Sequence, residues 1–318
     1  MPMTQDVSLA RMLRAKVPAT SANLGPGFDT LGLAIDLYLE VTAESSPHDE
    51  FIYSDTHHGT RGRDRGWHPG TEPRAEGNLV HAGFKAVFTH LGSASPPVRL
   101  TVRNPIPLAR GLGSSSAALV AGAALADAWS GTQLGRDGVF RLTAALEGHP
   151  DNVGPAVYGG FTVAAADEEG HFTAATLPVP PSWSLLFGVP AFELPTSQAR
   201  AALPSSYAVA DTVLTASRTA LWVAAVALAA PDLLRTASLD VLHQPFRASL
   251  VPGLQGAIDA LRDAGAYAAF LSGAGPTVGV IAGPQGLAGC RAVLDEFVGE
   301  GGLVLTPRAA SGYVVERW

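Results

Sequence analysis

The pattern of apolar and polar positions along the chain predicts a mixture of strands and helices. Short apolar or alternating runs bounded by turn residues are typical of strands, and they occur at residues 14–20, 31–45, 50–55, 98–104, 161–166, 182–191 and on both sides of a glycine turn within 266–283, with more strands at the end of the chain. Apolar residues at helical spacing predict helices at 78–91, 137–148, 196–203, about 211–229, 254–265 and 287–299, and a further helix that begins at the serines 114–116. Asn78 and Thr196 are expected to cap the helices that they open.

Strands and helices occur in both halves of the chain. A length of 318 residues favours about two domains. We place the boundary near residues 160–170, which divides the chain into a first domain at 1–165 and a second at 166–318. No internal repeat or low-complexity tract is present.

Composition restricts the classes of function. The chain is 47% hydrophobic, so it can bury a sizeable core. Its formal net charge of −7, without a basic block, argues against nucleic acid as a partner and against a basic membrane-binding face. The single cysteine, Cys290, favours a reducing, cytoplasmic location and is expected to be a small buried residue. We find no signal peptide, and we interpret the alanine-rich stretch before Pro231 as a core helix.

The stretch "PIPLARGLGSSSAA", which begins at Pro105, is the strongest chemical signal. It lacks the lysine of a Walker A loop, the third glycine of a dinucleotide-binding fingerprint and the final glycine of a nucleophile elbow. Glycines at 111 and 113 would let the backbone approach a ligand closely, and three small hydroxyls would stand at a helix N-terminus with its free N–H groups. These features are typical of a polyphosphate site, although a capped structural helix after a turn would have the same features.

This stretch strongly resembles the second motif of the GHMP kinases, the kinases of galactose, homoserine, mevalonate and phosphomevalonate. "KVPATSANLGPGFDTLGLAID" and "AFLSGAGPTVGVI" resemble the other motifs of the family, and with "LEGHPDNVGPAVYGGF" the set is similar to the homoserine kinases from Arg14 onward. Ser116 stands where the family usually has alanine, and Thr277 where it usually has serine. The resemblance implies an α+β fold of two domains, the first like ribosomal protein S5 and the second ferredoxin-like, with ATP and Mg²⁺ bound in the cleft.

The resemblance also implies a role for each motif residue. The phosphates of ATP would lie on Pro107, Leu108, Ala109, Arg110, Gly111, Leu112, Gly113, Ser114, Ser115, Ser116 and Ala117, and Asn78 would reach the base. Ser115 and Glu147 would bind Mg²⁺; a carboxylate in the last turn of a helix is unfavourable unless a cation offsets it. L-homoserine would contact Asn23, Asp29, Thr196, Arg200 and Arg247. His149, Asp151 and Asn152 would orient the reacting hydroxyl, with a base role for Asp151 left open, and Ser272, Gly273 and Gly275 would support the site.

Two other functions fit the same motifs. One is another GHMP kinase, acting on mevalonate or a sugar, although these substrates lack the ammonium group that Asp29 would bind. The other is a metabolite-binding regulator on the same fold, against which the intact glycine loop and Glu147 argue. Self-association into a homodimer is left open. The histidines of the segment "THHGTRGRDRGWH", which include His57 and His68, are interpreted as solvated rather than zinc-binding, and residues 54–75 are assigned no role.

Overall fold

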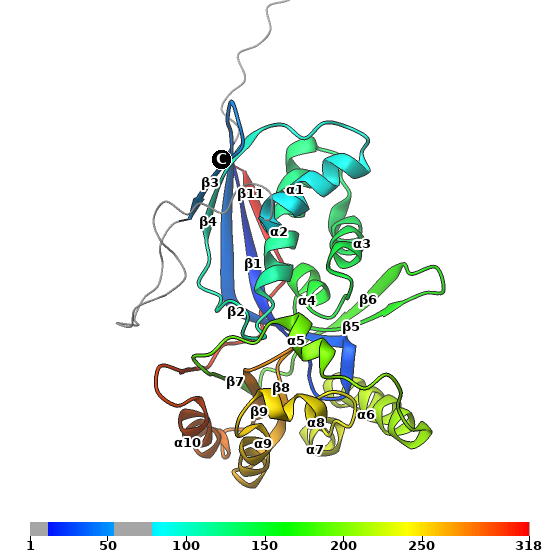
Figure 1. The fold of residues 1–318 in the computed structure, drawn as a ribbon, viewed down its shortest axis with the longest axis vertical. Helices are drawn as coiled ribbons and strands as arrows, with labels where there is room; N and C mark the ends of the chain where they lie inside the picture. The colour runs from blue at the N-terminus through cyan, green and yellow to red at the C-terminus, as the bar shows by residue number, and fades with distance from the viewer. Residues whose placement is uncertain (1–11, 54–77, 318) are drawn as a thin grey trace, which may run out of the picture.

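Two β-sheets organise the chain, and the computed structural model describes residues 12–53 and 78–317 (Figure 1). The segment with His57 and His68 lies outside these described residues. The first sheet has seven strands: β1 (Met12–Asn23), β2 (Gly27–Ser45), β3 (Glu50–Tyr53), β4 (Val98–Arg103), β5 (Phe161–Ala166), β6 (Phe172–Leu177) and β11 (Val314–Arg317). Its main path is β11–β1–β2–β4–β3, with β5 paired to β2 and β6 to β5.

The long strand β2 holds this sheet together. It runs for 19 residues, pairs with β4 through Glu40–Ser45 and with β5 through Leu31–Leu33, and lies along β1 for most of its length. β3 and β4 are parallel, and the other strand pairs are antiparallel. The C-terminal strand β11 returns to this sheet, so both ends of the described chain meet there (Figure 1).

Four helices lie together on one side of this sheet (Figure 1): α1 (Leu79–His90), α2 (Ser114–Ser130), α3 (Gly135–Glu147) and α4 (Val153–Tyr158). Small residues let α1 and α2 approach closely. A Cβ on Gly122 would collide with the carbonyl of Val80, and a Cβ on Gly83 with the carbonyl of Leu119. Helix α2 therefore packs deep in the first unit, with its N-terminus aimed at the second.

The second sheet has four antiparallel strands in the order β10–β7–β9–β8: β7 (Ser184–Val189), β8 (Ala266–Leu271), β9 (Val278–Ala282) and β10 (Leu303–Leu305). Its helices are α5 (Thr196–Ala201), α6 (Val209–Ala227), α7 (Leu234–Ala237), α8 (Gln244–Arg247), α9 (Leu254–Asp263) and α10 (Leu287–Val298), with short 3₁₀ turns at Pro231–Leu233 and Ala248–Leu250. This order, with helices between β7 and β8 and α10 between β9 and β10, is the expected ferredoxin-like arrangement.

Side chains of β7 alternate between two cores. Leu185 and Phe187 belong to the core shared with the first sheet and α6, whereas Leu186 belongs to the core under α9 and α10. Both faces of the second sheet are therefore buried, which explains why its strands are nearly continuous in apolar residues.

Most of the predicted elements are present, and their ends agree to within a few residues. The structure adds β6 and the short helices α4, α7 and α8, which the hydrophobic pattern did not reveal. The expected cap at Asn78 is confirmed, because its side chain accepts hydrogen bonds from the N–H groups of Val80 and His81. The expected cap at Thr196 is wrong: Pro195 is the N-cap, and Thr196 is already the first helical residue.

The change from the first sheet to the second comes after Leu177, later than the boundary expected at residues 165–166. A division at that point would separate β5 from its partner β6. The boundary stays a prediction, and the sheet pairing places it more naturally between β6 and β7.

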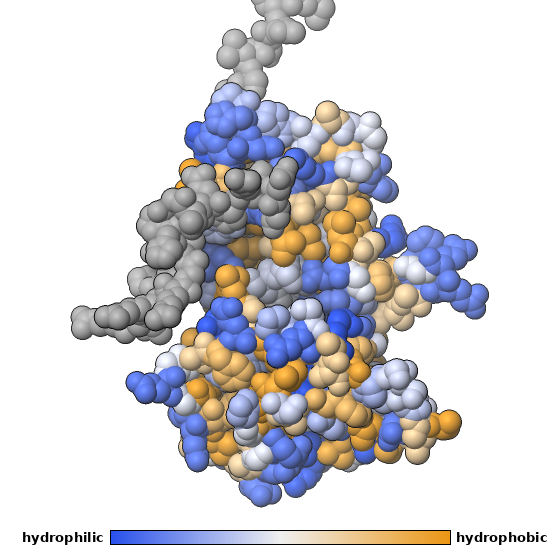
Figure 2. All heavy atoms as spheres, in the orientation of Figure 1, coloured by the Kyte–Doolittle hydropathy of each residue, from blue (hydrophilic) through white to orange (hydrophobic). Residues whose placement is uncertain are grey.

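Helix α6 differs from the core helix expected near residues 211–229. Among the described residues it is the one helix that is long and apolar enough to cross a membrane, at 19 residues, and core helices of soluble proteins meet the same criteria. Its buried residues, Trp222, Ala225 and Val226, lie in its C-terminal half, while Val209 and Val213 are exposed. On the face of the molecule drawn in Figure 2, polar and apolar side chains are interspersed.

Candidate active site

The glycine loop ends at the start of α2, with backbone geometry that requires glycine. Gly113 is the N-cap, in a left-handed conformation with φ of 67°, and no side chain of the described residues caps the helix. A Cβ there would collide with the hydroxyl of Thr20 and approach the amide oxygen of Asn152. Gly111, with φ of 75°, packs in the same way against the carbonyl of Ser272. The loop is therefore seated between two other predicted site segments, and the first turn of α2 has the uncapped N–H groups and positive dipole end that favour an anion.

The serines that follow connect this helix to α3. Ser115 Oγ donates to Glu147 Oε1 at 2.6 Å, and Ser116 Oγ donates to the same oxygen at 3.1 Å. Glu147 is the last residue of α3, and Gly148 follows it in a left-handed conformation. The two residues predicted to bind a metal therefore lie in contact, and their donor atoms are oxygens of the kind that Mg²⁺ prefers.

The end of β1 is the point where four segments meet. The N–H of Thr20 donates to the carbonyl of Leu112 at 3.1 Å, and its hydroxyl donates to Asn152 Oδ1 at 2.8 Å. Ser21 Oγ lies 2.7 Å from Ser272 Oγ, whose hydroxyl donates to the carbonyl of Gly111. The glycine loop, the segment after α3 and the turn between β8 and β9 are thus all fixed to one strand end.

Asn23 and Asp29 flank the turn between β1 and β2. The side chain of Asn23 is buried, donates to the carbonyl of Gly273 at 2.9 Å and accepts from the N–H of Asp29 at 3.1 Å. Asp29 has a φ of 52°, which is uncommon for a residue other than glycine and indicates that its surroundings impose this conformation. Asn23 therefore holds Asp29 in place and joins it to the Ser272–Gly275 turn.

Asp29 forms an ion pair that the sequence did not reveal. Arg200, on α5, donates from Nη2 and Nη1 to the two carboxylate oxygens, at 2.7 Å and 3.0 Å. Burial opposes a charged guanidinium, but the hydrogen bonds to Asp29 outweigh it and raise the pKa of Arg200. Thr196, one turn earlier on α5, is exposed.

The segment after α3 brings a histidine and an aspartate together. His149 Nδ1 lies 2.7 Å from Asp151 Oδ1, and the N–H of Asn152 donates to the same oxygen at 2.9 Å. Burial disfavours the imidazolium, but the bond to Asp151 and the carboxylates of Asp29 and Glu147 outweigh it and raise the pKa of His149. Ligand atoms of Asp29, His149 and Asp151 lie within 4.8 Å of one another, so the amino-acid side and the catalytic segment share one site.

Arg247 is a buried cation. It is only 2% exposed, and within the part of the chain that the structure describes no carboxylate lies at ion-pair distance from it. Its guanidinium donates to the carbonyls of Ala199 and Gly273, each at 3.1 Å. Burial, and then the positive charge of Arg200, lowers the pKa of Arg247 to about 10. A desolvated cation of this kind indicates a site that an anionic group completes.

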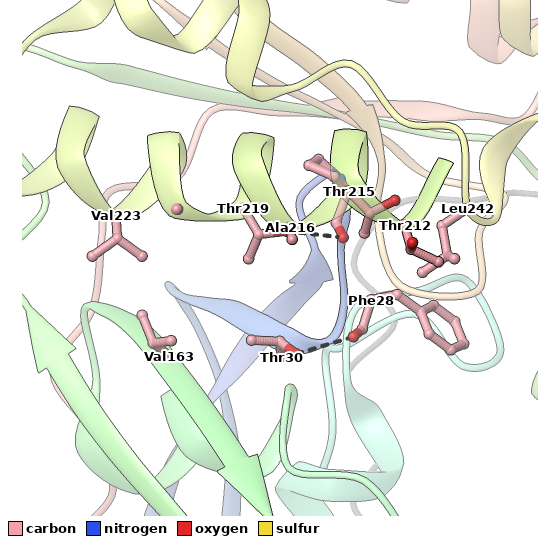
Figure 3. Close-up of a pocket in the computed structure, with 11 residues that line it drawn as sticks. Phe28, Thr30, Val163, Thr212, Thr215, Ala216, Thr219, Val223 and Leu242 are labelled. Atoms are coloured by element: carbon pink, nitrogen blue, oxygen red, sulfur yellow. Dashed lines mark hydrogen bonds between the residues drawn. The ribbon is translucent and has the colours of Figure 1, made fainter. Parts of the chain in front are cut away.

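Phe28 lies beneath both arginines, and the sequence did not single it out. The guanidinium groups of Arg200 and Arg247 lie 5.3 Å and 5.4 Å from the centre of its ring. Phe28 also lines a groove of about 510 Å³ against α6, together with Thr30, Val163 and the threonines of that helix (Figure 3). None of the described residues that line the groove is charged, whereas both arginines lie against the ring of Phe28.

Two predicted nucleotide-site residues have other contacts. Arg110 extends toward the second unit, where it donates to the carbonyls of Pro190 and Ala191. Asn78 is buried at the start of α1, and its amide N–H donates to the hydroxyl of Tyr53 at 2.9 Å. Leu108 and Ala109 are exposed on the loop.

Comparisons with known proteins find relatives over most of the chain. The family descriptions "GHMP kinases N terminal domain" and "GHMP kinases C terminal" match residues 78–160 and 224–295. The chain is 47% identical to the homoserine kinase of Thermus thermophilus over 300 residues, which cover 94% of this chain and 97% of that one. It is 41% identical to the homoserine kinase of Deinococcus radiodurans, covering 97% and 95% of the two chains.

Among solved structures, the homoserine kinase of Cytophaga hutchinsonii aligns with a TM-score of 0.82 at 24% identity, covering 99% of this chain and 100% of that one. The mevalonate kinase of L. major in complex with R-mevalonate aligns with a TM-score of 0.67 at 14% identity, covering 98% of each chain. These likenesses establish the fold, and the sequence identities above establish the kinship. The chain belongs to the GHMP kinase family, among its homoserine kinases.

Proposed function

We propose that this chain transfers the terminal phosphoryl group of ATP to the side-chain hydroxyl of L-homoserine, which gives O-phospho-L-homoserine and ADP, a step toward threonine. The observation that carries the proposal is a row of neighbouring polar and charged groups. It begins at the glycine loop, passes through Glu147, His149 and Asp151, and ends at the Asp29–Arg200 pair. A helix N-terminus suited to phosphate therefore lies near a charge arrangement suited to an amino acid.

The phosphate end of the row would hold ATP on the N-terminus of α2. The left-handed glycines 111 and 113 let the loop pack closely against Ser272 and Thr20, and the helix dipole favours the negative charge of the phosphates. Glu147 and Ser115 fit Mg²⁺, since a carboxylate and a hydroxyl already lie together there. When bound, the ion would neutralise phosphate charge as it develops in the transition state.

The other end of the row would hold homoserine. The substrate is a zwitterion, so it requires an acidic group for its ammonium and a basic group for its carboxylate. Asp29 supplies the first, and the guanidinium groups of Arg200 and Arg247 supply the second. Mevalonate and sugars have no ammonium group, so they would leave the carboxylate of Asp29 without a cationic partner on the substrate.

His149, Asp151 and Asn152 would orient the hydroxyl between the two ends. The oxygen Oδ1 of Asp151 already accepts hydrogen bonds from the backbone of Asn152 and is paired with His149. This favours a positioning role, and loose phosphoryl-transfer transition states need positioning more than a strong base. The variant Asp151→Asn separates the two roles: a loss of homoserine affinity alone would support positioning, and a collapse of turnover would support a base.

Release of ADP, measured by a coupled assay with L-homoserine, mevalonate and galactose in parallel, tests the proposal as a whole. We expect turnover with homoserine and Mg²⁺-ATP, and a product whose mass is that of phosphohomoserine. Turnover with mevalonate or galactose instead would assign the chain to another GHMP kinase activity, and no turnover with any of the three would favour a binding protein. A cytoplasmic location and a homodimer stay predictions.

A further inference from the structure

A buried histidine connects the two charged ends of the amino-acid pocket. His243, which directly precedes α8, is fully buried. Its Nε2 lies 2.7 Å from the carbonyl oxygen of Gly25, in the turn between Asn23 and Asp29. Its Nδ1 lies 3.2 Å from Nη1 of Arg247. One ring therefore contacts both the turn that carries the carboxylate and the guanidinium on the opposite side.

These two contacts determine where the ring carries its proton. Arginine is only a hydrogen-bond donor, so Nδ1 of His243 must accept. The proton is therefore on Nε2, which donates to Gly25. Burial lowers the pKa of His243 against the influence of Asp240, and the neighbouring Arg247 lowers it further. A neutral ring in a single tautomer serves as a rigid spacer.

The surroundings of the ring hold it in this orientation. The buried carboxylate of Asp240 accepts from the N–H groups of Leu242, His243 and Gln244, at 2.7 Å, 3.0 Å and 2.7 Å. The Gln244 side chain accepts from the N–H of Leu271, which attaches α8 to β8. The ring of Phe28 lies 5.5 Å from the imidazole. His243 thus cannot shift without disturbing the backbone on both sides.

The contacts of Arg247 leave one nitrogen for a ligand. Nε and Nη1 are occupied by Ala199, Gly273 and His243. Within residues 12–53 and 78–317, Nη2 makes no hydrogen bond. The direction of Nη2 is set by the partners of the other two nitrogens, among which His243 provides the one side-chain contact.

We propose that His243 is a positioning residue of the homoserine pocket, which sets the separation between Asp29 and Arg247 and thereby the length of amino acid that fits. The proposal rests on the proposed function, because it takes Asp29 and Arg247 as the groups that meet the substrate. His243 itself touches neither homoserine nor ATP in this assignment. It acts through Gly25 on one side and through Arg247 on the other.

Three substitutions separate the two contacts. His243→Phe keeps the ring and removes both hydrogen bonds. His243→Asn places an oxygen where Nδ1 stands, so it keeps the acceptor for Arg247 and loses the bond to Gly25. His243→Gln extends an amide toward the position of Nε2, so it favours the bond to Gly25. We expect His243→Phe to raise KM for homoserine roughly tenfold or more, with KM for ATP unchanged, and His243→Asn to recover most of that loss.

The double variant His243→Phe/Arg247→Ala tests whether the histidine acts through the arginine. If it does, His243→Phe raises KM for homoserine much less in the Arg247→Ala background than in the wild type, and the remaining increase measures the contact with Gly25. Ile258→Ala, in the core under α9, is the control for destabilisation and should leave both KM values unchanged. Thermal unfolding identifies any variant that fails to fold. If His243→Phe does not fold, the KM values of His243→Asn and His243→Gln are compared instead.

Three results would overturn the proposal. One is a KM for homoserine that is the same in His243→Phe and the wild type. Another is equal losses of homoserine and ATP affinity, which indicate a general structural role. The third is full additivity with Arg247→Ala. If the wild type itself does not turn over homoserine, the proposed function fails first, and the two failures are distinguished by the wild-type assay.

Discussion

Gly113 offers the sharpest test of how the phosphate loop is held. Its φ of 67° is in the left-handed region, and the position of a Cβ is already taken by the hydroxyl of Thr20 and approached by the amide of Asn152. The substitution Gly113→Ala therefore brings two penalties, one from the backbone and one from the collision. Gly131, at the other end of the same helix, has a φ of 73° and open space around its Cβ position, so Gly131→Ala has the backbone penalty alone.

The structure allows the size of each penalty to be estimated. A residue with a Cβ in the left-handed conformation lowers the free energy of unfolding by about 1–2 kcal/mol. The lower conformational entropy of the unfolded alanine variant offsets about 0.5 kcal/mol of this loss. Overpacking a buried cluster adds about 1–3 kcal/mol. We therefore expect Gly131→Ala to lower the free energy of unfolding by about 1 kcal/mol, and Gly113→Ala by about 2–4 kcal/mol.

Urea unfolding of both variants measures these changes, and steady-state kinetics measures their consequence at the site. Only Gly113→Ala should raise KM for ATP and lower kcat, because its methyl group displaces the Thr20–Asn152 hydrogen bond beside Asp151. In the background of Thr20→Ala, the added cost of Gly113→Ala should shrink, since the colliding hydroxyl is gone. Equal stability losses for Gly113→Ala and Gly131→Ala, with unchanged ATP kinetics, would refute the packing that we describe.

Three further predictions concern single side chains. Glu147→Gln should raise the Mg²⁺ concentration for half-maximal activity roughly tenfold or more. Its melting temperature should stay close to that of the wild type. An unchanged Mg²⁺ titration would contradict the role of Glu147 as a metal ligand. Asp29→Asn should raise KM for homoserine roughly tenfold or more, as steady-state kinetics would show. It should lower the free energy of unfolding by less than about 1 kcal/mol, because the pair with Arg200 is partly solvated. A larger loss in urea unfolding would indicate that the pair is mainly structural. Cys290 is fully buried, and burial raises the pKa of its thiol, so a thiol reagent should label none of the native protein and one site after denaturation; rapid labelling of the native protein would contradict the packing of α10.

The sequence was sufficient to predict elements whose pattern is strong on its own. The run Phe161–Ala166 is a strand with the expected bounds, and α9 and α10 begin at the expected residues. The strand β6 was missed because its side chains are mostly small or polar and none is fully buried, and it is defined by its pairing with β5. Helix α4 was missed because it contains Gly154 and Pro155, which discourage a helical interpretation, although proline is tolerated in a first turn.

The site residues were predicted from motifs, but the motifs do not indicate which of these residues contact one another. Nothing along the chain indicates that Asp29 would face Arg200, which lies 171 positions later. The sequence likewise could not show that Arg110 turns away from the loop to Pro190, or that His243 bonds Gly25. Each of these contacts depends on how the second sheet is set against the first, and local propensity holds no information about that.

One local signal was nevertheless present, in the run Thr20–Ser21–Ala22–Asn23 at the end of β1. These residues are almost completely buried, and a buried strand end is an unfavourable place for three polar side chains unless each has a partner. The partners come from two distant segments: Asn152, after α3, bonds Thr20, whereas Ser272 and Gly273, in the turn between β8 and β9, bond Ser21 and Asn23. These polar residues interrupt the apolar pattern of the strand because they form the hydrogen bonds that attach the distant segments to it. In a chain of this type, a short polar run within an otherwise apolar strand indicates where distant segments meet, and here they meet at the candidate active site.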